Sequence, residues 1–149
     1  MAITIKNLES ALAGESMAHI KYRYFAKIAR EEGFEDIAKH FWQTADQELL
    51  HAWGHLELLI GKPSTKECLE KAIEGETYEF TSMYPDFKRA AELEGNMHAA
   101  QIAKEQIEES KEHAEQFMAV LAKAEKRFAA LTKIEKRHAE AYKQKLETL

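Results

Sequence analysis

The sequence predicts an all-α fold, a bundle of four long antiparallel helices. Only six Gly and two Pro interrupt its 149 residues. Between them lie long stretches of Ala, Glu, Lys, Leu and Gln, which have high helix propensity. Amphipathic helices of about 25 residues bury their apolar stripes most simply against one another in an antiparallel bundle. We therefore expect residues 1–149 to form a single domain.

Glycine and proline delimit the first two helices. The first helix is expected over about 7–31, ending near Gly33, and the second over about 34–59. The string "IGKP" at 60–63 stops the second helix, because Gly and Pro are typical of helix ends. A polar connector, 61–66, follows.

The third helix is expected to begin between Ser64 and Cys68. Ser64 or Thr65 can act as its N-cap, and Glu67 completes a capping-box pattern with Ser64. Pro85 removes one backbone hydrogen bond and should bend this helix.

One more break precedes the last helical sequence. We expect it at "EGN", 94–96, because 97–149 holds only Ala-, Glu- and Lys-rich sequence. The region at about 96–124 is expected to form either an extension of the bundle helices or an additional helical excursion.

Charge and cysteine content exclude several classes of protein. The net charge is −5 and Lys and Arg are scattered among Glu, so no basic surface for nucleic acid is expected. Cys68 is the one cysteine, which excludes an internal disulfide framework and a CxxC metal knuckle. No apolar run approaches the roughly 18 residues of a membrane span, and "MAITIKNLES" does not resemble a secretory signal. These features predict a cytoplasmic protein.

Glutamate and histidine side chains fall in phase with the apolar stripe of each helix. On the first helix, for example, Glu15 is in phase with Leu8 and Leu12. The second and last helices each carry a Glu-x-x-His pair, and the third carries Glu-x-x-Glu. The whole set is Glu15, Glu48, His51, Glu76, Glu79, Glu135 and His138.

Metal ions would explain this inward placement. A buried carboxylate without a partner costs several kcal/mol, and five together repel one another. No comparable set of core Lys or Arg neutralises them, whereas two cations would, and carboxylates with imidazoles suit iron or manganese. Each short motif is weak alone, because Glu-x-x-Glu also occurs at Glu32/Glu35 and Glu67/Glu70. A metal-free interaction bundle therefore remains the alternative at this point.

Longer strings resemble the four helix signatures of the rubrerythrin family. They are "AGES" with "YRYF", "TADQE" with "HA", "GETYEFTSMYPDF" and "EKRHAEAY". The resemblance covers about 1–95 and 125–145. It implies a ferritin-like fold and a di-iron oxo centre, with manganese or mixed occupancy as the alternative. It also implies a homodimer or larger assembly, in which helices can be swapped between chains.

The resemblance assigns a role to each ligand. Glu15 and Glu76 would be terminal ligands of the two irons, and Glu48 and Glu135 would bridge them. His138 would bind the iron near Glu76.

Four further residues receive roles from the same resemblance. One iron would exchange Glu79 for His51 on reduction. Tyr22 and Tyr84 would act as catalytic residues that hydrogen-bond ligand carboxylates and orient them.

A second string competes for the last ligand position. "SKEHAEQF" at 110–117 resembles "EKRHAEAY", and an ungapped alignment would place His113 as the ligand. Ser110 would then occupy the position of the bridging glutamate, and serine cannot replace a bridging carboxylate. We therefore expect Glu135 and His138 to be the ligands, with 96–124 as an insertion.

The resemblance implies that the protein reduces hydrogen peroxide to water. The four-cysteine rubredoxin domain usual in the family is not expected in a chain with one cysteine. The electrons would therefore come from an external rubredoxin- or ferredoxin-like donor. The alternative at the same centre is a dioxygen-dependent oxidase, a ferroxidase or an iron-handling protein.

Overall fold

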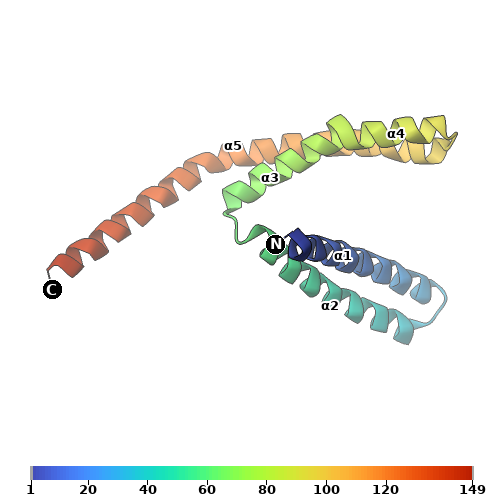
Figure 1. Cartoon of the computed structure of the whole chain (residues 1–149), viewed down its shortest axis with the longest axis horizontal. Helices are drawn as coiled ribbons and strands as arrows, with labels where there is room; N and C mark the ends of the chain where they lie inside the picture. The colour runs from blue at the N-terminus through green and yellow to red at the C-terminus, as the bar shows by residue number, and fades with distance from the viewer. Residues whose placement is uncertain (1, 149) are drawn as a thin grey trace. The chain divides into compact units, whose positions relative to one another are not determined.

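The computed structural model describes residues 2–148, and all its regular elements are helical. The predicted all-α fold is confirmed. Figure 1 shows the helices in order along the chain. They are α1 (Ala2–Glu31), α2 (Glu35–Ile60), α3 (Thr65–Tyr78), the π-helix η1 (Glu79–Met83), α4 (Tyr84–Leu93) and α5 (Met97–Glu147).

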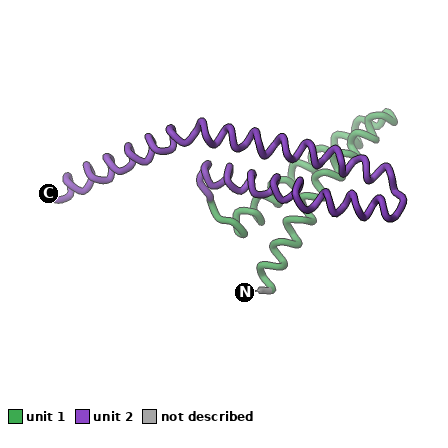
Figure 2. Tube along the Cα trace, turned by 90° about the horizontal axis from the view of Figure 1, so that it is seen from above, with its two compact units in different colours: residues 1–62 green, residues 63–149 purple. Residues whose placement is uncertain are grey.

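The chain divides into two compact units, residues 1–62 and 63–149, which Figure 2 colours separately. In the first unit α1 and α2 form an antiparallel hairpin. Gly33 closes the turn with φ 87°, a backbone conformation that favours glycine. The small residues Ala26, Ala29 and Ala38 form the core, with Phe41 packed against it. Alanines at the contact let the two helices approach closely.

The second unit is also a hairpin. α3, η1 and α4 run along the first part of α5, and the chain turns at Gly95, whose φ is 73°. Asn96 caps α5, because its side chain accepts a hydrogen bond from the backbone N–H of Ala99. The predicted break at 94–96 is therefore confirmed.

The capping box predicted at the start of the third helix is confirmed. Ser64 is the N-cap, its hydroxyl accepts from the Glu67 backbone N–H, and the Glu67 side chain accepts from the Ser64 backbone N–H. This arrangement satisfies two backbone donors that a helix start leaves unpaired.

The predicted bend at Pro85 takes the form of a π-helix just before the proline. η1 spans Glu79–Met83, and Pro85 lies in the first turn of α4. A proline in a helix's first turn costs little, because its missing N–H would be unpaired there anyway. The π-helix adds one residue to the turn and changes the direction in which Glu79 points relative to α4.

The segment 96–124 belongs to an extended helix, one of the two expected alternatives, and forms no additional excursion. It is the first half of α5, which continues without a break to Glu147. Its buried residues, Ala100, Ala103, Ser110 and Ala114, form the side that faces the other arm of the hairpin.

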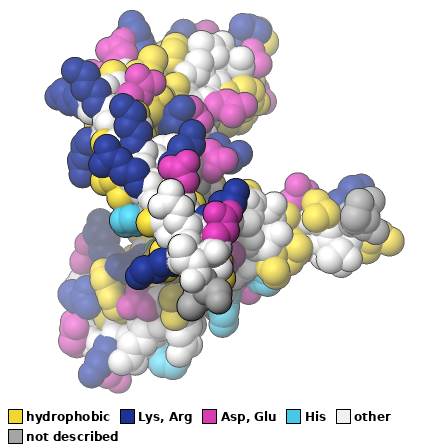
Figure 3. All heavy atoms as spheres, turned by 90° about the vertical axis from the view of Figure 1, so that its left-hand side faces the viewer, with side chains coloured by type: hydrophobic (Ala, Val, Ile, Leu, Met, Phe, Trp, Pro, Cys, Tyr) yellow, Lys and Arg dark blue, Asp and Glu magenta, His cyan; other side chains and the backbone are white. Residues whose placement is uncertain are grey.

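The outer surface is charged and mixed. On the face that Figure 3 shows, Lys and Arg side chains are interspersed with Asp and Glu. Exposed pairs such as Lys27–Glu31 and Lys88–Glu92 link neighbouring helical turns. Within residues 2–148, no helix combines the length and apolarity that crossing a membrane requires.

Candidate metal centre

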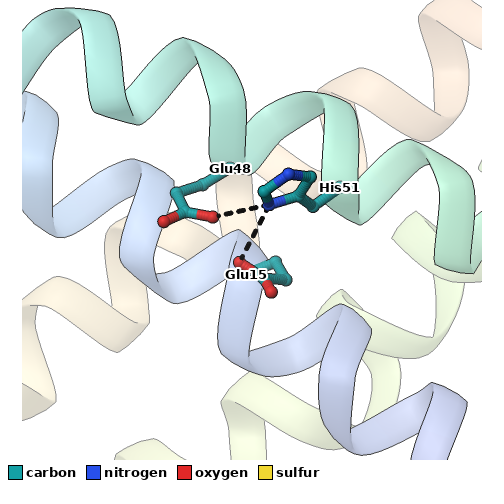
Figure 4. A group of neighbouring side chains, drawn as sticks. All are labelled: Glu15, Glu48 and His51. Carbon is teal, nitrogen blue, oxygen red and sulfur yellow. Dashed lines mark hydrogen bonds and ion pairs between the residues drawn. The ribbon is translucent and has the colours of Figure 1, made fainter.

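Three predicted ligands meet between α1 and α2. Glu15 lies on α1, and Glu48 and His51 lie one turn apart on α2, so their side chains share a face. One ligand atom from each of the three lies within 4.8 Å of the others. His51 Nδ1 is 2.9 Å from Glu48 Oε2 and 3.9 Å from Glu15 Oε2, as Figure 4 shows. We call these three residues the α1–α2 group.

The two carboxylates of the α1–α2 group influence each other's charge. A side-chain hydrogen bond with Glu48, followed by desolvation, raises the pKa of Glu15. The same hydrogen bond with Glu15, followed by that with His51, lowers the pKa of Glu48. Glu15 is therefore the more easily protonated of the two carboxylates. A bound cation would compete with protons there, because metal ligands must be deprotonated.

A second set of polar side chains meets between α3–η1 and α5. Ser110 Oγ donates a hydrogen bond to Glu79 Oε2 at 2.9 Å. One turn along, His113 Nδ1 lies 3.5 Å from Glu76 Oε2. That Glu76 oxygen is buried and has no hydrogen-bond partner among the described residues. We call Glu76, Glu79, Ser110 and His113 the α3–α5 group.

Neighbouring contacts hold α1 against α2. His19 Nδ1 lies 2.7 Å from the backbone oxygen of Ala45. Arg23 pairs with Asp46 at 2.6 Å and its guanidinium lies 3.8 Å from the centre of the Trp42 ring. These contacts fix the register in which Glu15 faces Glu48.

A family model described as rubrerythrin matches residues 6–121. The chain belongs to the rubrerythrin family. It is 40% identical over 131 residues to nigerythrin of Nitratidesulfovibrio vulgaris, covering 78% of this chain and 64% of that protein. A rubrerythrin of Porphyromonas gingivalis is 38% identical, covering 82% and 68%. A putative rubrerythrin of Methanocaldococcus jannaschii is 36% identical, covering 84% and 72%.

The chain thus spans about two thirds of the length of these rubrerythrin relatives. Solved structures of nigerythrin, among them a fully reduced, all-ferrous state, are 36% identical to it. The matches cover 82% of this chain and 67% of each nigerythrin chain, with TM-scores of 0.42 to 0.44. The ferritin-like, all-α fold class expected from the sequence is confirmed by the helical content and by the family.

The structure does not bring Glu135 and His138 to the other rubrerythrin ligands of its hairpin. Glu135 lines a surface hollow beside Ser64 and Thr65, at the start of α3, and His138 is exposed. Glu135 does not lie level with Glu79, because Ser110 occupies that level. At a rise of about 1.5 Å per residue, Glu135 lies about 37 Å further along α5. The role of Glu135 and His138 as metal ligands stays a prediction.

The family match agrees with this register, because it ends at residue 121 and leaves out Glu135 and His138. The signal that could have decided between the two strings was the hairpin turn. A turn at 94–96 pairs Glu79 with a residue near 110, and the turn was predicted correctly.

The tyrosines carried over from the family lie near aromatic neighbours. The Tyr22 ring is 6.1 Å from that of Phe41, and the Tyr84 ring is 6.0 Å from that of Phe87. Within residues 2–148, neither hydroxyl makes a hydrogen bond to a carboxylate. Their role in orienting ligands stays a prediction.

The donors present fit metal ions of the kind that rubrerythrins hold. The α1–α2 group offers two carboxylates and one imidazole. The α3–α5 group offers the same count from Glu76, Glu79 and His113. The unpartnered buried oxygen of Glu76 is what a missing cation would satisfy.

Proposed function

We propose that this rubrerythrin-family chain is a di-iron oxidoreductase that reduces hydrogen peroxide to water with electrons from a donor protein. The observation that carries the proposal is the α1–α2 group, with its three donor atoms within 4.8 Å of one another. Carboxylate and imidazole donors suit iron and manganese. The all-ferrous state named for nigerythrin supports iron as the metal.

Each of the two groups would offer its own donors to metal ions. Glu15, Glu48 and His51 would supply one set of donors, and Glu76, Glu79 and His113 the other. A pair of ferrous ions, when bound, supplies the two electrons that hydrogen peroxide and two protons consume in forming two water molecules. The protein's part is to hold the ligands in place and to set the charge around them.

The carboxylates control metal uptake through their protons. Glu15, whose pKa a side-chain hydrogen bond with Glu48 raises, takes up a proton more readily than a free glutamate does. A cation that binds there competes with that proton. Metal affinity should therefore fall as the pH decreases.

His51 and Glu79 are proposed as alternative ligands of one metal position. His51 Nδ1 already lies 3.9 Å from Glu15 Oε2 and its side chain is 60% exposed, so it has room to turn. Glu79 is held by the Ser110 hydroxyl. Tyr22 and Tyr84 are proposed to orient the ligand carboxylates once metal is bound.

Stopped-flow mixing tests the proposed reaction. Protein loaded with iron and chemically reduced is mixed with hydrogen peroxide in one experiment and with dioxygen in another, and reoxidation is followed by absorbance. We expect reoxidation by peroxide to be the faster. Equal rates, or a faster reaction with dioxygen, would reject peroxide reduction and favour an oxidase or ferroxidase at the same centre.

Metal analysis tests the step before the reaction. We expect protein purified without chelators to contain iron. A chain that takes up no transition metal would instead be a helical interaction protein, and the proposal would fail at its first premise.

A further inference from the structure

The two hairpins carry similar ligand patterns that differ at one position. In ferritin-like di-iron bundles, two helices each supply a glutamate and the other two each supply a Glu-x-x-His pair. α2 follows this pattern with Glu48 and His51. α5 offers Ser110 and His113 at the same spacing, so serine occupies the place of a glutamate.

Ser110 lies in the position that this comparison requires. Its side chain faces the other arm of the hairpin and only 3% of its surface is exposed. Its hydroxyl donates to Glu79 Oε2 at 2.9 Å. His113, three residues later, contacts Glu76 at 3.5 Å. The serine is therefore within the ligand cluster.

The replacement changes both charge and reach. A glutamate here would add a negative charge and two oxygen donors, whereas the serine hydroxyl is neutral and is occupied by Glu79. Four carboxylates remain in the two groups: Glu15, Glu48, Glu76 and Glu79. They balance two divalent cations, but among the described residues only the α1–α2 group brings three carboxylate or imidazole donor atoms within 4.8 Å of one another.

We propose that the metal centre of this chain is unequal, with one tightly and one weakly bound cation. This inference rests on the proposed function. The α1–α2 group binds the tight cation. The α3–α5 group binds the weak one, because Ser110 supplies no carboxylate there and acts instead as a positioning residue for Glu79.

Anaerobic titration of metal-free protein with Fe(II) tests this inference. We expect the second ion per chain to bind at least about tenfold more weakly than the first, since loss of even an indirect partner of a metal ligand typically costs 10–100-fold. Ser110→Glu should bring the second affinity close to the first. Two equally tight ions in the unaltered protein would overturn the inference and leave the proposed function standing. No binding at all would overturn both.

Further variants keep the test decisive if Ser110→Glu does not fold, since the larger side chain must enter a buried position. Ser110→Ala should weaken the second ion alone, and Ser110→Thr, which keeps the hydroxyl, should restore it. Ser82→Ala is the matched control, because Ser82 is an exposed serine of the same hairpin. Equal second-ion affinities for Ser110→Ala and Ser82→Ala would overturn the positioning role.

Discussion

Glu15 and Glu48 face each other across two helices, an arrangement that costs free energy unless a proton or a cation lies between them. The hydrogen bond between them raises the pKa of Glu15 and lowers that of Glu48, so Glu15 is the more easily protonated of the two. His51 lowers the pKa of Glu48 further when its Nδ1–H donates a hydrogen bond to the Glu48 carboxylate, at 2.9 Å. The two carboxylates of this group therefore favour the binding of a cation between them.

Replacing Glu48 with Gln should abolish tight metal binding without unfolding the metal-free chain. The variant keeps the shape of the side chain but removes a charge that repels Glu15. We expect less than one tightly bound ion per chain by elemental analysis. The rise in melting temperature that metal causes in the unaltered protein should disappear as well.

The double variant Glu135→Gln/His138→Ala is the matched control for Glu48→Gln. It removes the Glu-x-x-His pair that lies far along α5, so metal content should not change. Loss of metal in this variant would show that the distal pair binds metal after all, for example by reaching another chain.

The Ser64 cap should contribute to stability in a pH-dependent way. Hydrogen bonds from the Ser64 backbone N–H and hydroxyl, both 2.7 Å, lower the pKa of Glu67 below 4.5. Because the folded value is the lower one, this stabilisation is present above 4.5 and is lost as the pH falls through the folded value. Ser64→Ala should lower the free energy of unfolding by about 1 kcal/mol at neutral pH.

Unfolding in urea, followed by circular dichroism at neutral pH and at about pH 3, measures the effect of the cap. Glu67→Gln is the comparison variant, because glutamine can still complete a capping box but does not ionise. The difference in free energy of unfolding between the unaltered protein and Glu67→Gln should vanish at the lower pH. A difference that stays constant would contradict the assignment to Glu67.

At the scale of an element, η1 takes up one extra residue and so keeps the carboxylates of the third helix facing α5. Deleting Ser82 should convert η1 into ordinary α-helix with little rotation of α3 relative to α4, because the deletion removes the one residue that the π-turn adds. Glu76 and Glu79 would then still face Ser110 and His113. We expect retention of the weaker metal ion, whereas deleting the exposed Arg89 from the regular helix α4 should rotate α3 by about 100° and lose that ion. Loss of the ion after the Ser82 deletion would contradict this role for η1.

Local chemistry made most elements predictable from the sequence. Gly33, the Ser64–Glu67 capping box and the Gly95 turn each act within a few residues, so their effects can be read from a short string. The π-helix could not be predicted, because Pro85 indicates a disturbance but not its form. α1 also begins earlier than expected, at Ala2, since "AITIK" has no residue that forbids helix.

The predicted ligands differ in how far their placement depends on tertiary register. Glu15, Glu48 and His51 come together as expected, because one short turn joins their helices. The last ligand pair depends on where the second hairpin turns. Family chemistry argued for Glu135, whereas packing of Ala103, Ser110 and Ala114 against the other arm sets the level of Ser110. The packing of the hairpin, and not the residue type, therefore determines which residue of α5 lies beside Glu79.

At the scale of the whole molecule, each hairpin keeps large apolar side chains half exposed. The buried core consists of alanines, and no large side chain among the described residues is fully buried. On α1 and α2, Phe25, Phe34 and Ile37 line a surface hollow and are 39%, 51% and 46% exposed. Such a surface is typical of a face that pairs with another helical layer.

We therefore expect the protein to form at least a dimer in solution. Sedimentation equilibrium should give twice the mass of the chain or more. Ile37→Lys, which places a charge in the hollow, should weaken association at least tenfold, equivalent to about 1.4 kcal/mol. Leu58→Lys is the control, because Leu58 is 71% exposed on the same helix and does not line the hollow. A monomer at all concentrations would contradict the expectation.

The distal half of α5 has a dynamic consequence. Beyond the hollow at Ser64 and Glu135, the helix has no neighbour within its hairpin, and every residue from 129 to 148 is exposed. A single helix of this length is marginally stable in water. Its amide protons should therefore exchange with deuterated solvent well before those of 97–121, so that this stretch frays and re-forms while the rest of the hairpin stays closed.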